Sequence, residues 1–168
     1  GTEIFIISDE PYRRIIFDGL TYPQVFPHYP NTVVVNSHAK DLALPGERIG
    51  HIAVNPEYPD RQELVDGLIF CNRTLGFVNA PALMQHIVRA LQTATVNVAE
   101  YQSKRDFLFR HLTDIGYEIV RPQGAFFMFP RSPVEDDVAF TAELQQHNIL
   151  VVPGRGFGAP GYFRISYC

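Results

Sequence analysis

The chain has 168 residues, of which 46% are hydrophobic and 19% are charged, and its formal net charge at pH 7 is −4. This composition, without a low-complexity tract or a block of like charges, is typical of a soluble globular protein and excludes a disordered segment or a coiled coil. Because the 14 basic residues are scattered along the chain, we expect neither a nucleic-acid nor a membrane partner.

Apolar runs in the first part of the chain predict strands of a parallel sheet. The run Ile4–Ile7 is unbroken and rich in β-branched side chains, which is typical of a strand covered on both faces by helices. A second run, Val33–Val35, ends at Asn36-Ser37, and a third, Ile49–Val54, follows soon after. These runs do not complete a doubly wound sheet, which usually has about five or six strands.

Helices are predicted after the third strand. Apolar side chains with the i, i+4 spacing of an amphipathic helix occur in two successive stretches. The first stretch carries Leu64, Val65, Leu68 and Ile69, and the second carries Leu83, Met84, Ile87, Val88 and Leu91. A third helix, with apolar residues from Tyr101 to Ile115, is expected to end at Gly116 and to run between two structural units.

The chain after Gly116 has a different pattern. Short strand-like pieces lie at 117–120, 125–129, 149–152 and 162–167, and a helix is predicted near 140–147. This pattern indicates a small α+β unit, and we place a domain boundary near residue 100. Because the chain opens within a predicted strand and closes at the end of another, we expect it to be a piece of a longer chain.

Groups that can carry chemistry follow the first two predicted strands. Asp9 lies at the carboxyl end of the first strand, where ligands usually bind in open α/β sheets, and Pro11 stiffens the turn that leads to Tyr12. Lys40 follows the second strand and lies at the same sheet edge if the strands are parallel. A lysine there can form a Schiff base when its surroundings favour the neutral amine.

Donors suited to a phosphate group lie on either side of Lys40. Ser37 offers a hydroxyl and Arg48 a planar fork of N–H groups. Gly46 and Gly50 would let the backbone approach a bulky anion. Taken singly, each of these residues is more often structural than functional.

One cofactor needs all of these groups together. Pyridoxal phosphate requires an amine for its aldehyde, an acid for its pyridine nitrogen, a phenol near its ring oxygen and donors for its phosphate. The order DEPY, S-x-x-K, G-x-R-x-G in this chain resembles the fold type I pyridoxal-phosphate enzymes, specifically the class I/II aminotransferases of the aspartate aminotransferase superfamily.

The resemblance covers nearly the whole chain and implies an α/β fold in two parts. Residues 1–100 would be the C-terminal part of the large cofactor-binding domain, a mostly parallel sheet with helices. Residues 101–168 would be the small α+β C-terminal domain, lacking its final helix. The N-terminal half of a family member, which supplies further contacts to the cofactor, is not in this sequence, so we expect the fragment to be inactive alone.

The resemblance also implies a role for each matched residue. Lys40 would hold the cofactor as a Schiff base and then move the proton between the substrate Cα and the cofactor. Asp9 would pair with the pyridinium, and Tyr12 would donate a hydrogen bond to the ring hydroxyl. Ser37 and Arg48 would bind the phosphate.

A predicted substrate residue lies near the end of the chain. Arg164, in GYFRIS, matches the arginine that binds the substrate α-carboxylate, although by local sequence it could equally be an ordinary strand residue. The preceding glycine run, 154–161, is not a dinucleotide loop, because Ala159 replaces the last glycine of G-x-G-x-x-G and Pro160 interrupts the expected helix. Residues 124–127, GAFF, resemble a family strand near the substrate but are interpreted as core.

Cysteines and histidines give no sign of a metal or of disulfides. Cys71 and Cys168 lie outside any CxxC pair, and none of the six histidines has a metal-ligand spacing. There is no apolar run of roughly 20 residues and no signal peptide pattern. We therefore predict a cytoplasmic protein without a metal.

The function implied by the resemblance is transamination between an amino acid and a 2-oxo acid by a homodimer. Two alternatives stay open. A lyase, decarboxylase or racemase of the same fold could use Lys40 and Asp9, and the chain could instead be a non-catalytic dimerisation or interaction module. The substrate amino acid is not encoded in these motifs.

Overall fold

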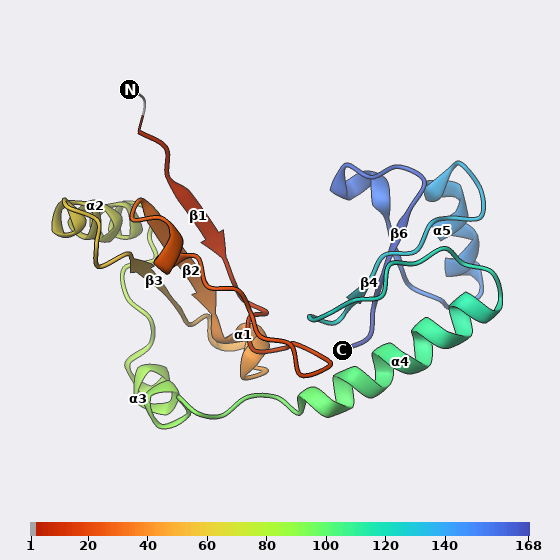
Figure 1. The fold of residues 1–168 in the computed structure, drawn as a ribbon, viewed down its shortest axis with the longest axis horizontal. Coiled ribbons are helices and arrows are strands. Elements are labelled where there is room, and N and C mark those ends of the chain that lie inside the picture. The colour runs from red at the N-terminus through yellow and green to blue at the C-terminus, as the bar shows by residue number, and fades with distance from the viewer. Residues whose placement is uncertain (1–2) are drawn as a thin grey trace. The chain divides into compact units, whose positions relative to one another are not determined.

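A computed structural model describes residues 3–168, and the fold divides into two compact units (Figure 1). The first unit holds the residues up to Arg14 and Thr21–Val96, and the second holds Ile15–Leu20 and Asn97–Cys168. The short segment Ile15–Leu20 thus belongs to the second unit, although it precedes most of the first in sequence. The assignment of the two halves to a cofactor-binding domain and a small domain remains a prediction.

The first unit is built on a three-stranded sheet with the order β1-β2-β3. Its strands are β1 (Ile6–Asp9), β2 (Thr32–Ser37) and β3 (Gly50–Val54). β1 pairs with β2 in parallel, as expected, but β3 is antiparallel to β2. The reason is the connection from β2 to β3, which holds only one helical turn and a 3-10 turn and is too short for a parallel crossover.

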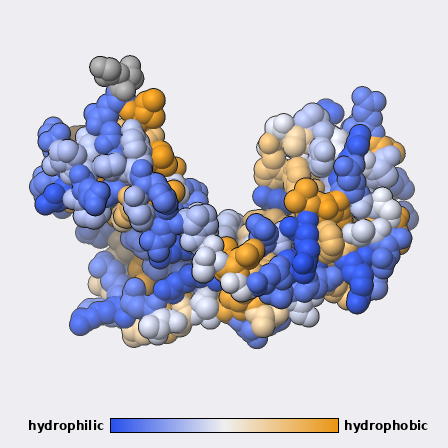
Figure 2. Space-filling model, viewed as in Figure 1, coloured by the Kyte–Doolittle hydropathy of each residue, from blue (hydrophilic) through white to orange (hydrophobic). Residues whose placement is uncertain are grey.

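Burial in the sheet is uneven. The central strand β2 is largely buried, whereas Ile6 is 41% exposed and Ile7 is 72% exposed. Figure 2 shows the apolar surface that the N-terminal strand presents. The expectation that this strand is covered on both faces is therefore wrong for residues 3–168. β1 is also an edge strand there, because only β2 pairs with it. Such an apolar edge is a template for pairing with further strands.

The helices of the first unit are α1 (His38–Asp41), α2 (Arg61–Thr74) and α3 (Ala82–Ala90), with 3-10 turns η1 (Phe26–His28) and η2 (Pro45–Glu47). The predicted apolar stripe of α3 is confirmed for Met84 and Val88, which pack on the buried Ile49. It is wrong for Leu83, which is 70% exposed. The stripe of α2 is only half-buried, and its Ile69 is 47% exposed. No helix within residues 3–168 combines the length and apolar character needed to cross a membrane.

Gly50 lies where β2 and β3 approach most closely. A Cβ at this position would be 2.3 Å from the carbonyl oxygen of Asn36, whereas a Cβ at Gly46 would meet nothing within 4 Å. The structure therefore gives Gly50 a role in strand pairing, and the approach of an anion to this backbone stays a prediction.

We expect Gly50→Ala to lower the free energy of unfolding of the full-length protein by about 1–3 kcal/mol, because the added methyl group forces the strands apart. Gly46→Ala is the matched control and should change it by less than about 0.5 kcal/mol. Urea denaturation of both variants measures the difference. Equal losses would show that the close approach at Gly50 is not the limiting contact.

The second unit combines α4 (Val98–Asp114) and α5 (Asp137–Gln146) with a sheet of order β4-β6-β5. The strands are β4 (Phe127–Met128), β5 (Val152–Pro153) and β6 (Phe163–Ser166), and both pairings are antiparallel. This is the predicted α+β unit, but the expected strand at 117–120 is wrong, because those residues adopt no regular structure. Gly116 has φ +99° directly after α4, as its predicted place at a helix end requires.

A buried arginine ties the segment Ile15–Leu20 to the second unit. Arg105 of α4 is fully buried and donates two hydrogen bonds to the carboxylate of Asp18, at 2.8 and 3.0 Å. Its guanidinium also lies 4.8 Å from the centre of the buried Phe17 ring. The hydrogen bond from Arg105 lowers the pKa of Asp18 below its usual value, so the pair is ionised at neutral pH.

Candidate active site

The parallel pairing of β1 and β2 brings their carboxyl ends to one edge of the sheet. Asp9 pairs with Val35 in the ladder, and the N–H of Glu10 donates to the Val35 carbonyl at 2.8 Å. β2 then ends at Ser37. The condition for placing Asp9 near Ser37 and Lys40, that the first two strands are parallel, is met.

The two acidic residues of DEPY differ in their surroundings. Glu10 is 5% exposed and accepts a hydrogen bond from the Ser8 hydroxyl at 2.9 Å, with Arg13 at 3.8 Å. Asp9, by contrast, is exposed at the end of the strand, and Tyr12 is half-buried in the turn that follows. Of these two acids, only Asp9 is accessible at this edge.

Lys40 lies in α1, the single helical turn that starts directly after β2. The Ser37 hydroxyl oxygen caps this turn by accepting a hydrogen bond from the Ala39 N–H at 3.2 Å. Lys40 is half-buried. The cap fixes where the chain leaves the strand, and so fixes the position of the lysine backbone at the sheet edge.

The antiparallel strand β3 begins at the edge where β2 ends. Gly50 pairs with Ser37, and the His38 N–H donates to the Ile49 carbonyl at 3.0 Å. Arg48, just before β3, is therefore close in space to the end of β2. Its guanidinium is exposed and donates one hydrogen bond to the Pro45 carbonyl at 3.0 Å, and its backbone is left-handed, with φ +50°.

Asp41, next to Lys40, was missed by the sequence interpretation. Its side chain is 1% exposed, and one carboxylate oxygen lies 3.3 Å from Nδ1 of His38. Its backbone carbonyl accepts hydrogen bonds from the Val96 N–H at 2.9 Å and the Thr95 hydroxyl at 3.1 Å. These contacts attach the turn that carries Lys40 to the segment that precedes α4.

Arg14 supports the same turn. Its guanidinium donates to the Ala94 carbonyl at 2.7 Å and to the Gln92 carbonyl, while its Nε lies 4.0 Å from the Asp41 carboxylate. No local pattern marks either residue, because Arg14 and Asp41 lie far apart in sequence and meet only through the fold.

The His38 and His51 rings lie beside this cluster, 5.6 Å apart. Burial lowers the pKa of the His51 imidazole, and the neighbouring His38 and Arg13 lower it further. His51 is consequently neutral at pH 7. Among residues 3–168 there is no group of three or more histidine, cysteine or acidic side chains arranged to hold a metal ion.

Arg164, the predicted substrate residue, lies on β6 of the second unit. Its guanidinium carbon is 4.4 Å from the centre of the Phe127 ring and 4.3 Å from the centre of the Phe157 ring. Both phenylalanines were left out of the predicted site. The signal available was the GAFF segment, whose Phe127 contacts Arg164 in the structure.

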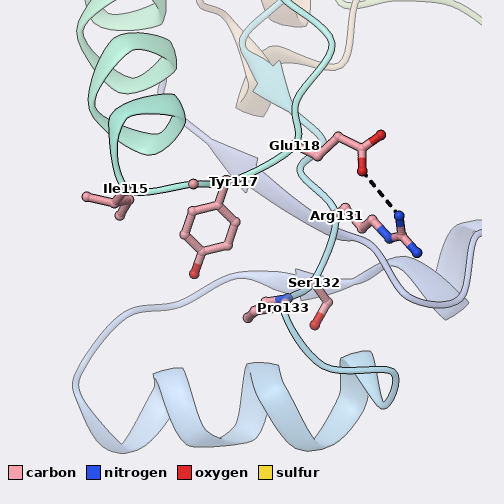
Figure 3. Close-up of a pocket in the computed structure, with 7 residues that line it drawn as sticks. Ile115, Tyr117, Glu118, Arg131, Ser132 and Pro133 are labelled. Carbon is pink, nitrogen blue, oxygen red and sulfur yellow. Dashed lines mark hydrogen bonds and ion pairs between the residues drawn. The ribbon is translucent and has the colours of Figure 1, made fainter.

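A hollow of about 490 Å³ in the second unit holds none of the predicted site residues. It is lined by Ile115, Gly116, Tyr117, Glu118, Arg131, Ser132 and Pro133. Figure 3 shows that Glu118 and Arg131 form an ion pair across its rim, at 3.2 Å. Because no predicted site residue lines it, the hollow is not the candidate site.

Known proteins match the chain over nearly its whole length. The model of the family "Aminotransferase class I and II" matches residues 2–168. The chain belongs to this family. A probable aspartate aminotransferase of Methanocaldococcus jannaschii is 31% identical over 98% of this chain and 45% of its own length.

Crystal structures give the same result for the fold. An aminotransferase from Eubacterium rectale is 44% identical, with a TM-score of 0.92 over 98% of this chain and 41% of that chain. An aspartate aminotransferase variant from Thermus thermophilus is 27% identical, with a TM-score of 0.83 over 98% of this chain and 46% of that chain. The predicted fold type I architecture is confirmed, and the chain spans less than half the length of these relatives.

Proposed function

We propose that the protein to which this aminotransferase-family chain belongs transfers an amino group between an amino acid and a 2-oxo acid, with pyridoxal phosphate as cofactor. The observation that carries the proposal is the set of groups at one edge of the first sheet. Four groups lie there. The exposed acid Asp9 ends β1, the hydroxyl of Ser37 ends β2, the Lys40 amine follows β2, and the exposed guanidinium of Arg48 precedes β3. This is the set of donors and acceptors that the cofactor requires.

The residues fit the phosphate end of the cofactor. The Ser37 hydroxyl oxygen already accepts a hydrogen bond from the Ala39 N–H, so its own proton is available for a phosphate oxygen. Arg48 uses Nη1 for Pro45 and has further N–H groups for a bidentate contact. Together they would hold the phosphate next to the turn that carries Lys40.

The other residues would act at the reacting end. When bound, pyridoxal phosphate supplies an aldehyde and a ring that withdraws electrons from the substrate Cα. The Lys40 amine would bind the aldehyde. Once the substrate amine has replaced Lys40, the freed lysine would take the Cα proton and return it. The Asp9 carboxylate would keep the ring nitrogen protonated, and Tyr12 would donate to the ring hydroxyl. Arg164 would bind the substrate α-carboxylate with two parallel hydrogen bonds.

The proposal extends to assembly and location. We propose that the full-length protein is a cytoplasmic homodimer, as the resemblance to the aminotransferase family implies. The substrates are an amino acid and a 2-oxo acid.

Product analysis of the full-length protein tests this function. The protein is incubated with pyridoxal phosphate and a panel of amino acids, with and without 2-oxoglutarate. With the acceptor present, we expect a new 2-oxo acid and glutamate in equal amounts over many turnovers, and without it at most one 2-oxo acid per bound cofactor. Ammonia, carbon dioxide or a D-amino acid formed without the acceptor would instead identify a lyase, decarboxylase or racemase. Stable oligomers that bind no cofactor would identify a non-catalytic module.

A further inference from the structure

The Arg164 side chain is held by aromatic rings rather than by a carboxylate. Its guanidinium carbon lies 4.4 Å from the Phe127 ring centre and 4.3 Å from that of Phe157. In the described part of the second unit Arg164 forms no ion pair, although other arginines there do. Those paired with an aspartate or glutamate are Arg105, Arg121, Arg131 and Arg155.

A missing ion pair alone would mean little, since the exposed Arg110 has none among residues 3–168 either. Arg164 differs because it is half-buried and has two rings against it. A ring face attracts a guanidinium through its quadrupole and favours stacking on the flat side of the group. The N–H edges then remain free to meet a carboxylate in their own plane.

Phe157 is placed by a compact turn in the glycine run. It ends η3 (Gly154–Phe157), between β5 and β6. The Gly154 N–H donates to the Tyr162 carbonyl at 2.7 Å, and the Gly154 carbonyl accepts from the Ala159 N–H at 3.0 Å. A Cβ at Gly154 would lie 2.3 Å from the Ala159 carbonyl oxygen, so this close turn requires glycine. The glycine run thus forms a support for an aromatic ring.

A buried acid fixes the same turn from the side of α5. Asp137 is fully buried, and its Oδ2 accepts a hydrogen bond from the Arg155 backbone N–H at 2.8 Å. This backbone hydrogen bond lowers the pKa of Asp137 below its usual value, so the acceptor is a carboxylate at neutral pH. The Arg155 guanidinium lies 3.7 Å from the other oxygen. Residues 154–157 are therefore anchored independently of Arg164.

Hydrophobic burial does not account for Phe157. The side chain remains 47% exposed, whereas Phe163 on the neighbouring strand is 2% exposed. A half-exposed ring on an anchored turn contributes little to the core. The Phe157 ring meets the Phe129 ring edge-on, with centres 6.1 Å apart, and lies closer to the Arg164 guanidinium, at 4.3 Å.

We propose that Phe127 and Phe157 are positioning residues, which hold the Arg164 guanidinium with its N–H edge toward the α-carboxylate of the amino acid or 2-oxo acid. The inference rests on the proposed function, because it assigns Arg164 to that carboxylate. It adds the aromatic contacts that set the orientation, and hence the carboxylate affinity, of the arginine.

The test uses the full-length protein loaded with pyridoxal phosphate. Phe157→Leu removes the ring and keeps an apolar side chain, and Phe157→Tyr keeps the ring. For Phe157→Leu we expect the KM of the amino acid to rise by about three- to fivefold with kcat within about twofold, as loss of one cation–π contact predicts. Calorimetry should show the affinity for 2-oxoglutarate falling by the same factor and the cofactor affinity unchanged. Phe157→Tyr should retain wild-type values.

Phe140→Leu is the matched control, because that ring packs on Phe163, with centres 5.2 Å apart, and should leave KM unchanged. An active Phe157→Leu enzyme with unaltered KM and 2-oxoglutarate affinity would overturn the inference and leave the proposed function intact. If Phe140→Leu raised KM as much as Phe157→Leu, the inference would also be overturned, because the loss of a ring away from Arg164 would then have the same effect. A wild-type protein that does not transaminate would refute the proposed function, and the inference with it.

Discussion

Lys40→Ala in the full-length protein is expected to lower the turnover of amino acid to 2-oxo acid by about a thousandfold or more. The substitution removes both the amine that would bind the cofactor aldehyde and the base that would move the Cα proton, and a positioned general base alone contributes about 10²–10⁴-fold. The half-reaction with amino acid and no acceptor, followed by quantifying the 2-oxo acid, measures this step directly.

The chain provides its own control for this experiment. Lys40 and Lys104 are its only lysines, and Lys104 is an exposed residue of α4 that pairs with Glu100 at 3.0 Å. Lys104→Ala should retain full activity, because an exposed pair of this kind contributes little to stability. If Lys40→Ala kept a substantial fraction of wild-type turnover, the assignment of Lys40 as the reacting amine would be wrong.

Asp9→Asn is expected to lower kcat by about a hundredfold or more at saturating cofactor, since loss of one preorganised electrostatic group typically costs about 10²–10³-fold. The amide has no charge to keep a ring nitrogen protonated, whereas its size and its place at the end of β1 are unchanged. Steady-state rates at several cofactor concentrations separate this effect from weaker cofactor binding.

The control for Asp9→Asn removes the same charge elsewhere in the first unit. Asp60 is exposed at the start of α2 and makes no side-chain hydrogen bond to that helix. Asp60→Asn should therefore leave kcat within about twofold of the wild-type value. A similar fall in both variants would mean that net charge, not the position of Asp9, governs the rate.

Local patterns were enough to predict β2, because the branched run Val33–Val35 favours a strand. The helical turn after β2, capped by Ser37, was not predicted. The place of Lys40 directly after β2 could be read from the sequence, and its role stays a prediction. The third strand was predicted as part of a parallel sheet, whereas β3 is antiparallel to β2 and begins at the edge where β2 ends, next to Arg48.

Contacts between distant parts of the chain could not be read from the sequence. Asp41 looks like a surface residue until Arg14 and the segment before α4 surround it. The ion pair between Arg105 and Asp18 likewise joins residues that are 87 positions apart. The exposure of β1 was misjudged for a related reason. An apolar run shows that a strand can be buried, but it does not show which other elements cover it.

Reductive trapping tests the central claim, that Lys40 is the lysine that holds the cofactor. The full-length protein is saturated with pyridoxal phosphate, reduced with borohydride, digested and mapped by peptide mass. We predict one stoichiometric label, on the peptide that contains Lys40. When free cofactor is removed before reduction, Lys104→Ala should keep this label and Lys40→Ala should lose it. Labelling of another lysine, or no stoichiometric label at all, would contradict the account.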